Sequence, residues 1–234
     1  MPEINPDFSL QSAQIGNEKN ALLIIDNFAG APAELRELAT TGPAFSAQAS
    51  DFYPGLRKPV TGHYPAACLT ALEPLLKNRF KIPGHAKMEL SLCAFSLTTT
   101  PPGQLRPIQS IPHIDTHDPN QFALVQYLCD PEFGGTSLYR HRTTGFESIT
   151  QPRLQDYFRL VKQEVMAEDR REFTYINGST ALFERIARVE ARFNRAVIYR
   201  SNQLHSADIN SQGGLPADPR RGRLTLNAFF RFTL

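Results

Sequence analysis

Up to about residue 90, the hydrophobic positions predict one strand and two helices. Residues 21–28 form a short apolar run that is typical of a strand. Residues 31–39 follow as a helix with a proline in its first turn, where the missing N–H is tolerated. Residues 66–80 carry apolar side chains at helical spacing, although Pro74 predicts a kink or a shifted start. Residues 52–65 contain several Pro and Gly and are expected to be irregular.

Beyond these helices the pattern changes to short strands separated by turns. Residues 87–100 have the β-branched and aromatic content of a strand, which a Pro-Pro-Gly turn ends. Five later segments have the same character: HIDTH, QFALVQYLCD, TSLYRHR, RAVIYRS and RLTLNAFFRF. A helix at about 152–167 interrupts them. Short strands at this spacing favour a sandwich or barrel such as a jelly roll.

The whole chain, residues 1–234, is expected to form a single domain. Residues 1–90 are expected to supply an α/β cover, and residues 91–234 the jelly-roll core. No internal repeat, low-complexity tract or linker argues for a second unit. The predicted fold class is therefore mainly β with α, a jelly-roll core with flanking N-terminal helices.

Composition narrows the classes of partner. The 234 residues are 41% hydrophobic, which is enough to bury a core, and the net charge of +2 does not demand nucleic acid. No apolar stretch approaches the roughly 20 residues of a membrane helix, and the first 14 residues do not resemble a signal peptide. The three scattered cysteines favour reduced thiols. We expect a soluble, cytoplasmic protein.

The segment IPHIDTHD, residues 111–118, contains two histidines and two aspartates in eight positions. On a strand, residues two apart point to the same face, so His113 and Asp115 could offer a nitrogen and an oxygen to one metal ion. His117 continues this face and is a rival ligand. The alternative, that these are solvated polar residues after Pro112, stays open.

Two later segments could complete a site. His205 follows the apolar strand AVIYR and a short turn. Residues 222–230 alternate Arg223, Thr225 and Asn227 with aliphatic side chains, so one face of this strand is expected to line a polar space. Arginine suits a carboxylate, because its planar fork can form two hydrogen bonds with it.

The stretch YLCDPEFGGTSLYRHR, residues 127–142, is expected to form a hairpin. A strand ends at Leu128, an acidic turn contains Gly134 and Gly135, and a second strand begins at Thr136. Paired glycines allow a tight or bulged connection.

Together these motifs resemble the iron(II)- and 2-oxoglutarate-dependent dioxygenases, especially the prolyl-4-hydroxylase-like branch. The matching elements occur in the family's order: His113-x-Asp115, Tyr127-Leu-Cys-Asp130, Gly134-Gly135, His205 and Arg223. The stretches IDNFAGAPAELRELA, YPGLR and GGTSLYRHR also resemble a largely uncharacterised bacterial group of this fold.

The chain departs from the family pattern in two places. Cys129 stands where the hydroxylases usually have Asn. The segment between His205 and Arg223 is longer than usual, which leaves Arg220 and Arg221 as alternatives for the cosubstrate arginine. Arg223 is preferred because the alternating strand begins there.

The resemblance implies a double-stranded β-helix, the cupin-like form of a jelly roll, with iron(II) held by His113, Asp115 and His205. It also implies 2-oxoglutarate as cosubstrate, with dioxygen as the oxidant. Arg223 is expected to bind the distal carboxylate, assisted by Tyr127 and Thr225. The implied reaction is hydroxylation of a small molecule or of an amino-acid or peptide substrate.

Two other functions remain open. One is a cupin-type metal enzyme that does not use 2-oxoglutarate, for which Arg223 is dispensable. The other is a non-catalytic jelly-roll binding module, which binds no stoichiometric iron. In each case we expect neither nucleic acid nor membrane as a partner, and a homodimer remains open.

Overall fold

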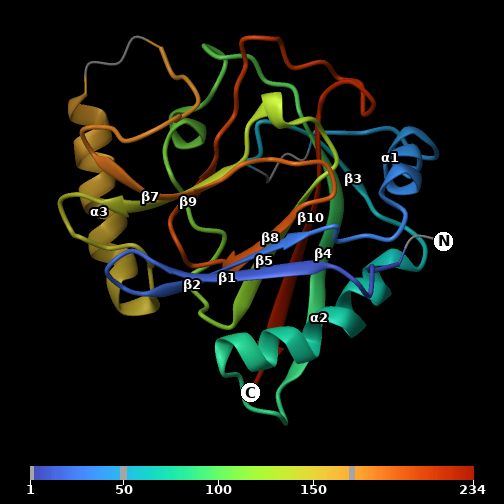
Figure 1. Ribbon diagram of the computed structural model, residues 1–234. Helices are drawn as coiled ribbons and strands as arrows, with labels where there is room; N and C mark the ends of the chain where they lie inside the picture. The colour runs from blue at the N-terminus through green and yellow to red at the C-terminus, as the bar shows by residue number, and fades with distance from the viewer. Residues whose placement is uncertain (1–2, 48–51, 169–171) are drawn as a thin grey trace.

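The computed structural model describes residues 3–47, 52–168 and 172–234, which form two antiparallel sheets (Figure 1). The larger sheet has the strand order β1-β2-β8-β5-β10-β4-β3, and the smaller sheet has the order β7-β6-β9. The larger sheet contains β1 (Ser9–Ile15), β2 (Asn20–Asp26), β3 (Gly55–Pro59), β4 (Lys87–Thr98), β5 (Gln121–Tyr127), β8 (Ala196–Arg200) and β10 (Arg223–Thr233). The smaller contains β6 (Thr136–His141), β7 (Phe183–Val189) and β9 (His205–Ala207). Within the described ranges the α-helices are α1 (Pro32–Thr40), α2 (Tyr64–Phe80) and α3 (Gln151–Ala167), and two short 3-10 helices are η1 (Pro107–Ser110) and η2 (Pro131–Phe133).

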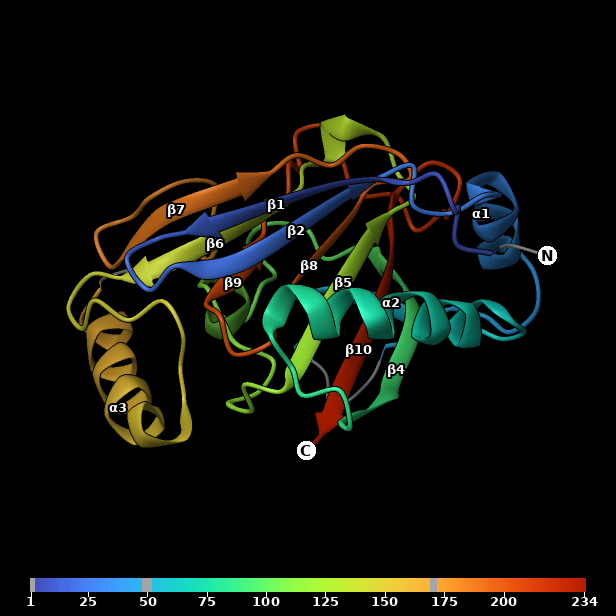
Figure 2. The same cartoon turned by 60° about the horizontal axis from the view of Figure 1, so that its bottom comes forward.

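One face of the larger sheet packs against the N-terminal helices. Leu224 and Leu226 of β10 are fully buried in a core cluster with Leu72 and Leu76 of α2 and Leu35 of α1. Figure 2 shows α2 crossing the strands of this sheet. Burial of an aliphatic side chain contributes roughly 1.5–3 kcal/mol, so this layer supplies much of the hydrophobic stabilisation.

The opposite face of the larger sheet lies against the smaller sheet. Val125 and Tyr127 of β5 share an apolar cluster with Leu138 of β6 and Val189 of β7. The outer side of the smaller sheet is covered by α3, whose buried residues include Tyr157. Two facing antiparallel sheets with helices on their outer sides confirm the predicted mainly β, jelly-roll class.

Most expected elements are present close to their predicted bounds. The strand at 21–28 is β2, the strand at 87–100 is β4, and the two predicted N-terminal helices are α1 and α2. Pro74 lies inside α2, which continues through it to Phe80. The helix expected at 152–167 is α3.

Four expectations need correction. The irregular segment 52–65 contains the edge strand β3, paired with β4. The N-terminal residues also contribute β1 and β2 to the larger sheet, and neither the polar β1 (SLQSAQI) nor β7 is among the predicted strands. HIDTH forms no strand; it makes one isolated bridge, from His113 to His205. The predicted hairpin at 127–142 is wrong, because β5 and β6 belong to different sheets.

The connection from β5 to β6 crosses from the larger sheet to the smaller, and its two glycines permit a close backbone approach. Gly134 has a φ of +82°, a conformation that L side chains rarely adopt. A Cβ on Gly134 would lie 1.7 Å from the Asp208 carbonyl oxygen, and one on Gly135 would lie 1.8 Å from that of Val189. The glycine pair is therefore required by packing against β7 and the residues after β9.

Gly135→Ala is expected to lower the free energy of unfolding by at least about 2 kcal/mol, because a clash with backbone cannot be relieved by a rotamer change. Gly213→Ala is the control, since an added Cβ there meets no atom within 4 Å in the part of the chain that the structure describes. That variant should change stability by less than about 0.5 kcal/mol. Urea unfolding measures both, and equal stabilities would contradict the close approach.

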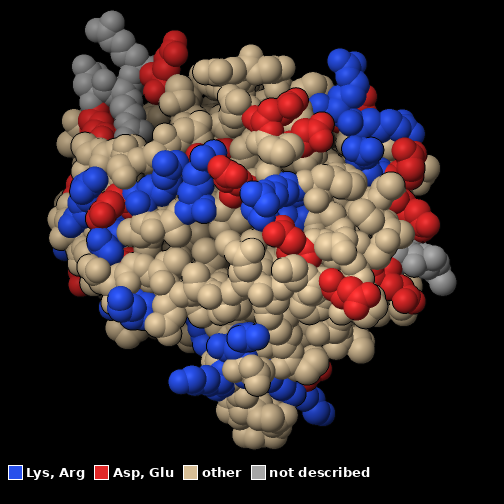
Figure 3. All heavy atoms as spheres, viewed as in Figure 1, with Lys and Arg blue, Asp and Glu red and all other residues tan. Residues whose placement is uncertain are grey.

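Acidic and basic side chains lie next to one another across much of the face in Figure 3, so neither sign of charge dominates it. Among the helices that the structure describes, none is long and apolar enough to cross a membrane.

Candidate metal centre

A possible metal site forms where His113 and Asp115 meet His205, which lies 90 positions after Asp115 in the sequence. One ligand atom from each lies within 4.8 Å of the others. The closest approach of Asp115 to His205 is 3.7 Å, between Oδ2 and Nε2, and its Oδ1 is 4.0 Å from His113 Nε2. Two imidazole nitrogens and one carboxylate oxygen thus face a common point.

The backbone holds these residues together without a regular strand at 111–118. His113 and His205 exchange both N–H to carbonyl hydrogen bonds, each of 2.9 Å. The Asp115 N–H donates to the Ser201 carbonyl at 2.9 Å. The His113-x-Asp115 segment is therefore held in place by β9 and the turn before it. It does not form a strand of its own.

His205 is buried and is prepared to act as a neutral ligand. Its Nδ1 is 2.9 Å from the Gln203 carbonyl, which can only accept, so Nδ1 carries the proton. The lone pair on Nε2 then faces Asp115. Burial lowers the pKa of His205 to about 4, against a smaller raising effect of that carbonyl, so the ring is neutral near pH 7. Metal-ligating histidines commonly have such a partner on their other nitrogen.

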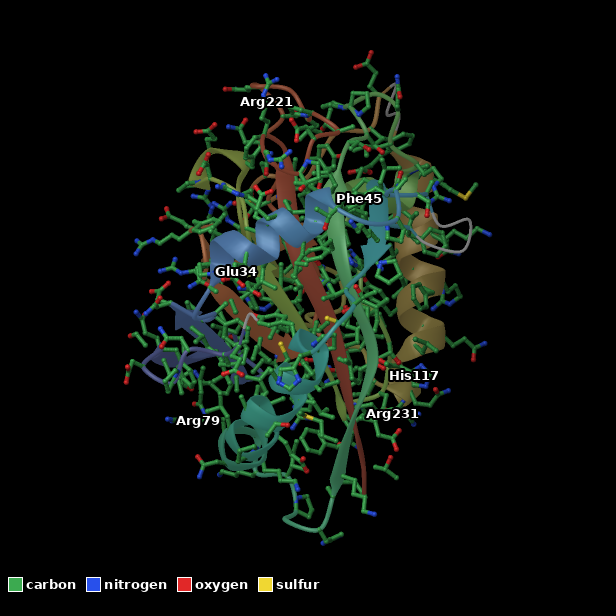
Figure 4. The ribbon with its side chains drawn as sticks, turned by 90° about the vertical axis from the view of Figure 1, so that its right-hand side faces the viewer. Glu34, Phe45, Arg79, His117, Arg221 and Arg231 are labelled. Atoms are coloured by element: carbon green, nitrogen blue, oxygen red, sulfur yellow. The ribbon has the colours of Figure 1, made fainter. Side chains whose placement is uncertain are left out.

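His113 and Asp115 are both exposed residues and His205 is buried, so the centre opens toward solvent at the His113-x-Asp115 segment. The side chain of His113 is 46% exposed and that of Asp115 is 16% exposed. His117, the rival ligand, does not join the three residues within the described ranges. It instead lines a separate groove together with Arg231. Figure 4 shows these two labelled side chains near one another.

Arg223 lies on the inner face of β10 with only 2% of its surface exposed. Its Nη2 donates to the Gly135 carbonyl at 3.0 Å, so the glycine connection also orients the guanidinium. Its Nε is buried and has no hydrogen-bond partner among the residues described. A guanidinium with an unused donor is an unusual feature of a folded interior, where such groups are normally paired.

Tyr127 and Thr225 are neighbours of Arg223 on the same face. They lie opposite each other across β5 and β10. The Tyr127 hydroxyl donates to Thr136 Oγ1 at 2.7 Å, and the Thr225 hydroxyl donates to Asn227 Oδ1 at 2.7 Å. Both hydroxyls therefore already have partners inside the protein.

The positive charge of Arg223 acts on four tyrosines and a cysteine. These residues are Tyr53, Tyr127, Cys129, Tyr175 and Tyr199. Burial raises the pKa of each side chain, and the charge of Arg223 opposes that rise. Tyr199 links the two parts of the site, because the Asp115 carboxylate also raises its pKa and its ring centroid is 4.7 Å from that of His205. Tyr199 is not among the predicted site residues, although its hydroxyl-bearing side chain in the otherwise apolar run AVIY, six residues before His205, was a usable signal.

The alternative arginines lie outside this interior. Arg220 is exposed and pairs with Glu37 at 2.8 Å. Arg221 is also exposed, and Figure 4 shows it at the edge of the molecule. Of the three candidates, Arg223 alone is buried.

The chain belongs to a protein family described as a family of unknown function, DUF6445, which it matches over residues 6–230. No curated protein matches it. Among solved structures, HygX from Streptomyces hygroscopicus with nickel and 2-oxoglutarate bound is similar with a TM-score of 0.43 at 15% identity, over 92% of this chain and 83% of that chain. EvdMO1 is similar with a TM-score of 0.43 at 12% identity, over 95% of this chain and 55% of that chain.

Proposed function

We propose that the protein is an iron(II)- and 2-oxoglutarate-dependent oxygenase that hydroxylates a small molecule or an amino-acid or peptide substrate. The observation that carries the proposal is the convergence of His113, Asp115 and His205. Tyr199 connects this cluster with the buried Arg223, because its ring lies against His205 and its pKa responds to the charges of both Asp115 and Arg223.

The donor set fits iron(II). Two histidines and one carboxylate that leave further positions open are the ligand set of non-haem iron oxygenases, whereas a structural zinc site is closed by four protein ligands. The neutral Nε2 of His205 and the Gln203 carbonyl behind its Nδ1 meet the requirements of such a ligand. His113, Asp115 and His205 would hold the ion, which when bound supplies the activation of dioxygen coupled to decarboxylation of the 2-oxo acid.

The protein's own part is to bind and orient. Arg223 would bind the distal carboxylate of 2-oxoglutarate, because its buried guanidinium has an unused Nε donor and its fork suits a carboxylate. Tyr127 and Thr225 flank that position and could add hydrogen bonds by exchanging their present partners. The buried tyrosines around Arg223 would exclude water, which strengthens the ion pair.

Anaerobic titration tests the proposal. We expect one iron(II) per chain, and a weak visible band when 2-oxoglutarate is added, followed by succinate formation in air. An iron-loaded protein that gives no band and forms no succinate would favour a cupin-type metal enzyme. A protein that binds no iron at all would favour a non-catalytic binding module.

A further inference from the structure

The turn between β8 and β9 carries an unusual set of buried polar side chains. Ser201, Asn202 and Gln203 are 0%, 3% and 2% exposed. Within the ranges that the structure covers, four of their side-chain atoms have no hydrogen-bond partner: Ser201 Oγ, Asn202 Oδ1, Gln203 Oε1 and Gln203 Nε2. Buried polar atoms are nearly always paired, so three consecutive exceptions need an explanation.

A second buried glutamine shows what a structural role looks like in this fold. Gln126 is 0% exposed, its Oε1 accepts from the Tyr64 hydroxyl at 2.8 Å, and its Nε2 donates to Asn194 Oδ1 at 3.1 Å. Gln203 is buried to a similar extent but neither end of its amide is used. Its side chain therefore does not stabilise the fold in the way that Gln126 does.

The position of the turn connects it to the metal centre. The Ser201 carbonyl accepts from the Asp115 N–H, and the Gln203 carbonyl accepts from His205 Nδ1. Leu204 packs into the cluster under α3. Residues 203–205 are extended, since Gln203 bridges to Ser148 and His205 begins β9. Successive side chains of an extended segment point to opposite sides, so Gln203 is expected on the same side as His205, opposite the cluster that holds Leu204.

We propose that Gln203 is a substrate-contacting residue of the centre and recognises an uncharged group that presents a donor and an acceptor side by side, namely an amide. Its side chain is uncharged, so it cannot neutralise a carboxylate or an ammonium group and does not favour either. The Gln203 amide can pair with another amide through two parallel hydrogen bonds. The word substrate rests on the proposed oxygenase function, whereas the amide contact applies to any ligand of the site.

A stability comparison tests whether the Gln203 amide is free for a ligand. Replacing an unpaired buried amide by an apolar group of similar size removes a desolvation cost, so Gln203→Leu should raise Tm by about 2–4 °C. The matched control Gln126→Leu leaves Tyr64 and Asn194 unpaired and should lower Tm by about 4 °C or more. If Gln203→Leu lowers Tm as Gln126→Leu does, its amide is satisfied by structural water and the inference is wrong.

A binding experiment tests the class of ligand. In 15N-labelled, zinc-loaded full-length protein, the Gln203 side-chain amide resonances are identified by their loss in Gln203→Leu and followed during titration with acetamide or acetate. Acetamide should shift them with an affinity at least about ten-fold higher than acetate, a difference of about 1.4 kcal/mol. Equal affinities, a preference for acetate, or no shift with acetamide would overturn the assignment.

These results can be separated from the fate of the oxygenase proposal. A wild-type protein that binds neither iron nor 2-oxoglutarate would remove the proposed reaction but leave the Tm comparison valid, and the acetamide and acetate titrations would then be run on the metal-free protein. Wild-type binding of both, together with a destabilised Gln203→Leu variant, would remove this inference alone.

Discussion

His113→Ala, Asp115→Ala and His205→Ala are each expected to abolish stoichiometric iron(II) binding, whereas His117→Ala should retain it. The three residues supply all the protein ligands of the proposed ion. Loss of an outer-shell partner already costs about 10–100-fold in metal affinity, so loss of a ligand itself should exceed about 100-fold. Turnover of 2-oxoglutarate should disappear with the metal. Iron bound after anaerobic dialysis, measured by elemental analysis, checks the expectation.

His117→Ala is a matched control, because it removes an imidazole two residues from Asp115 without touching the cluster. His113 is half-exposed, so its removal should leave the fold intact, which circular dichroism can verify. Normal iron content in Asp115→Ala would refute the cluster. Loss of iron in His117→Ala with retention in His113→Ala would move the ligand to His117.

The elements that could be predicted from sequence are those whose burial pattern is local. Strand β10 alternates aliphatic residues with Arg223, Thr225 and Asn227. This two-residue alternation is enough to predict that its aliphatic face packs against the helices and that its polar face points between the two sheets. The helices α1 and α3 have proline in their first turn and apolar residues at helical spacing. In these segments local propensity and tertiary packing agree, so the pattern is a reliable guide.

The errors fall where pairing over long distances decides the structure. The β5–β6 segment looks like a hairpin because two strands flank two glycines, yet β6 pairs with β7 and β9 instead. The polar edge strand β1 is recruited by β2 and has little apolar signal of its own. HIDTH has β-branched residues, but its backbone hydrogen bonds go to Ser201 and His205, which no local pattern reveals.

In the candidate site, too, the sequence predicted which residues matter locally but not how distant segments bring them together. Motif order was enough to nominate His113, Asp115, His205 and Arg223, but it could not provide the 4.8 Å convergence of the first three. Nor could it show that Arg223 is buried with an unused donor, or that the Gln203 amide is unpaired. These properties depend on which side chains the two sheets bring together, and one sequence does not contain that information in a local form.

Arg223→Ala is expected to weaken 2-oxoglutarate binding by several-hundred-fold or more while iron(II) binding is retained. Removing one partner of a buried ion pair costs about 3–5 kcal/mol, because the other charge is left unpaired away from water. Arg223→Lys should recover only part of the loss, since an ammonium group cannot form the two-bond fork. The measurement is anaerobic titration of 2-oxoglutarate into the iron(II) protein, followed through its visible band.

Arg220→Ala provides the control, because it removes an exposed arginine of the same segment that pairs with Glu37. It should bind 2-oxoglutarate as the wild type does. Arg223→Ala also leaves the Gly135 carbonyl without its hydrogen bond, so some loss of folding stability is expected. An iron affinity equal to that of the wild type would show that the metal centre of this variant remains folded. If Arg223→Ala binds normally and Arg221→Ala fails, the cosubstrate arginine is Arg221. If neither substitution weakens 2-oxoglutarate binding, the buried guanidinium of Arg223 binds another anion or only stabilises the fold. A metal enzyme that does not use 2-oxoglutarate then explains the cluster of His113, Asp115 and His205 better.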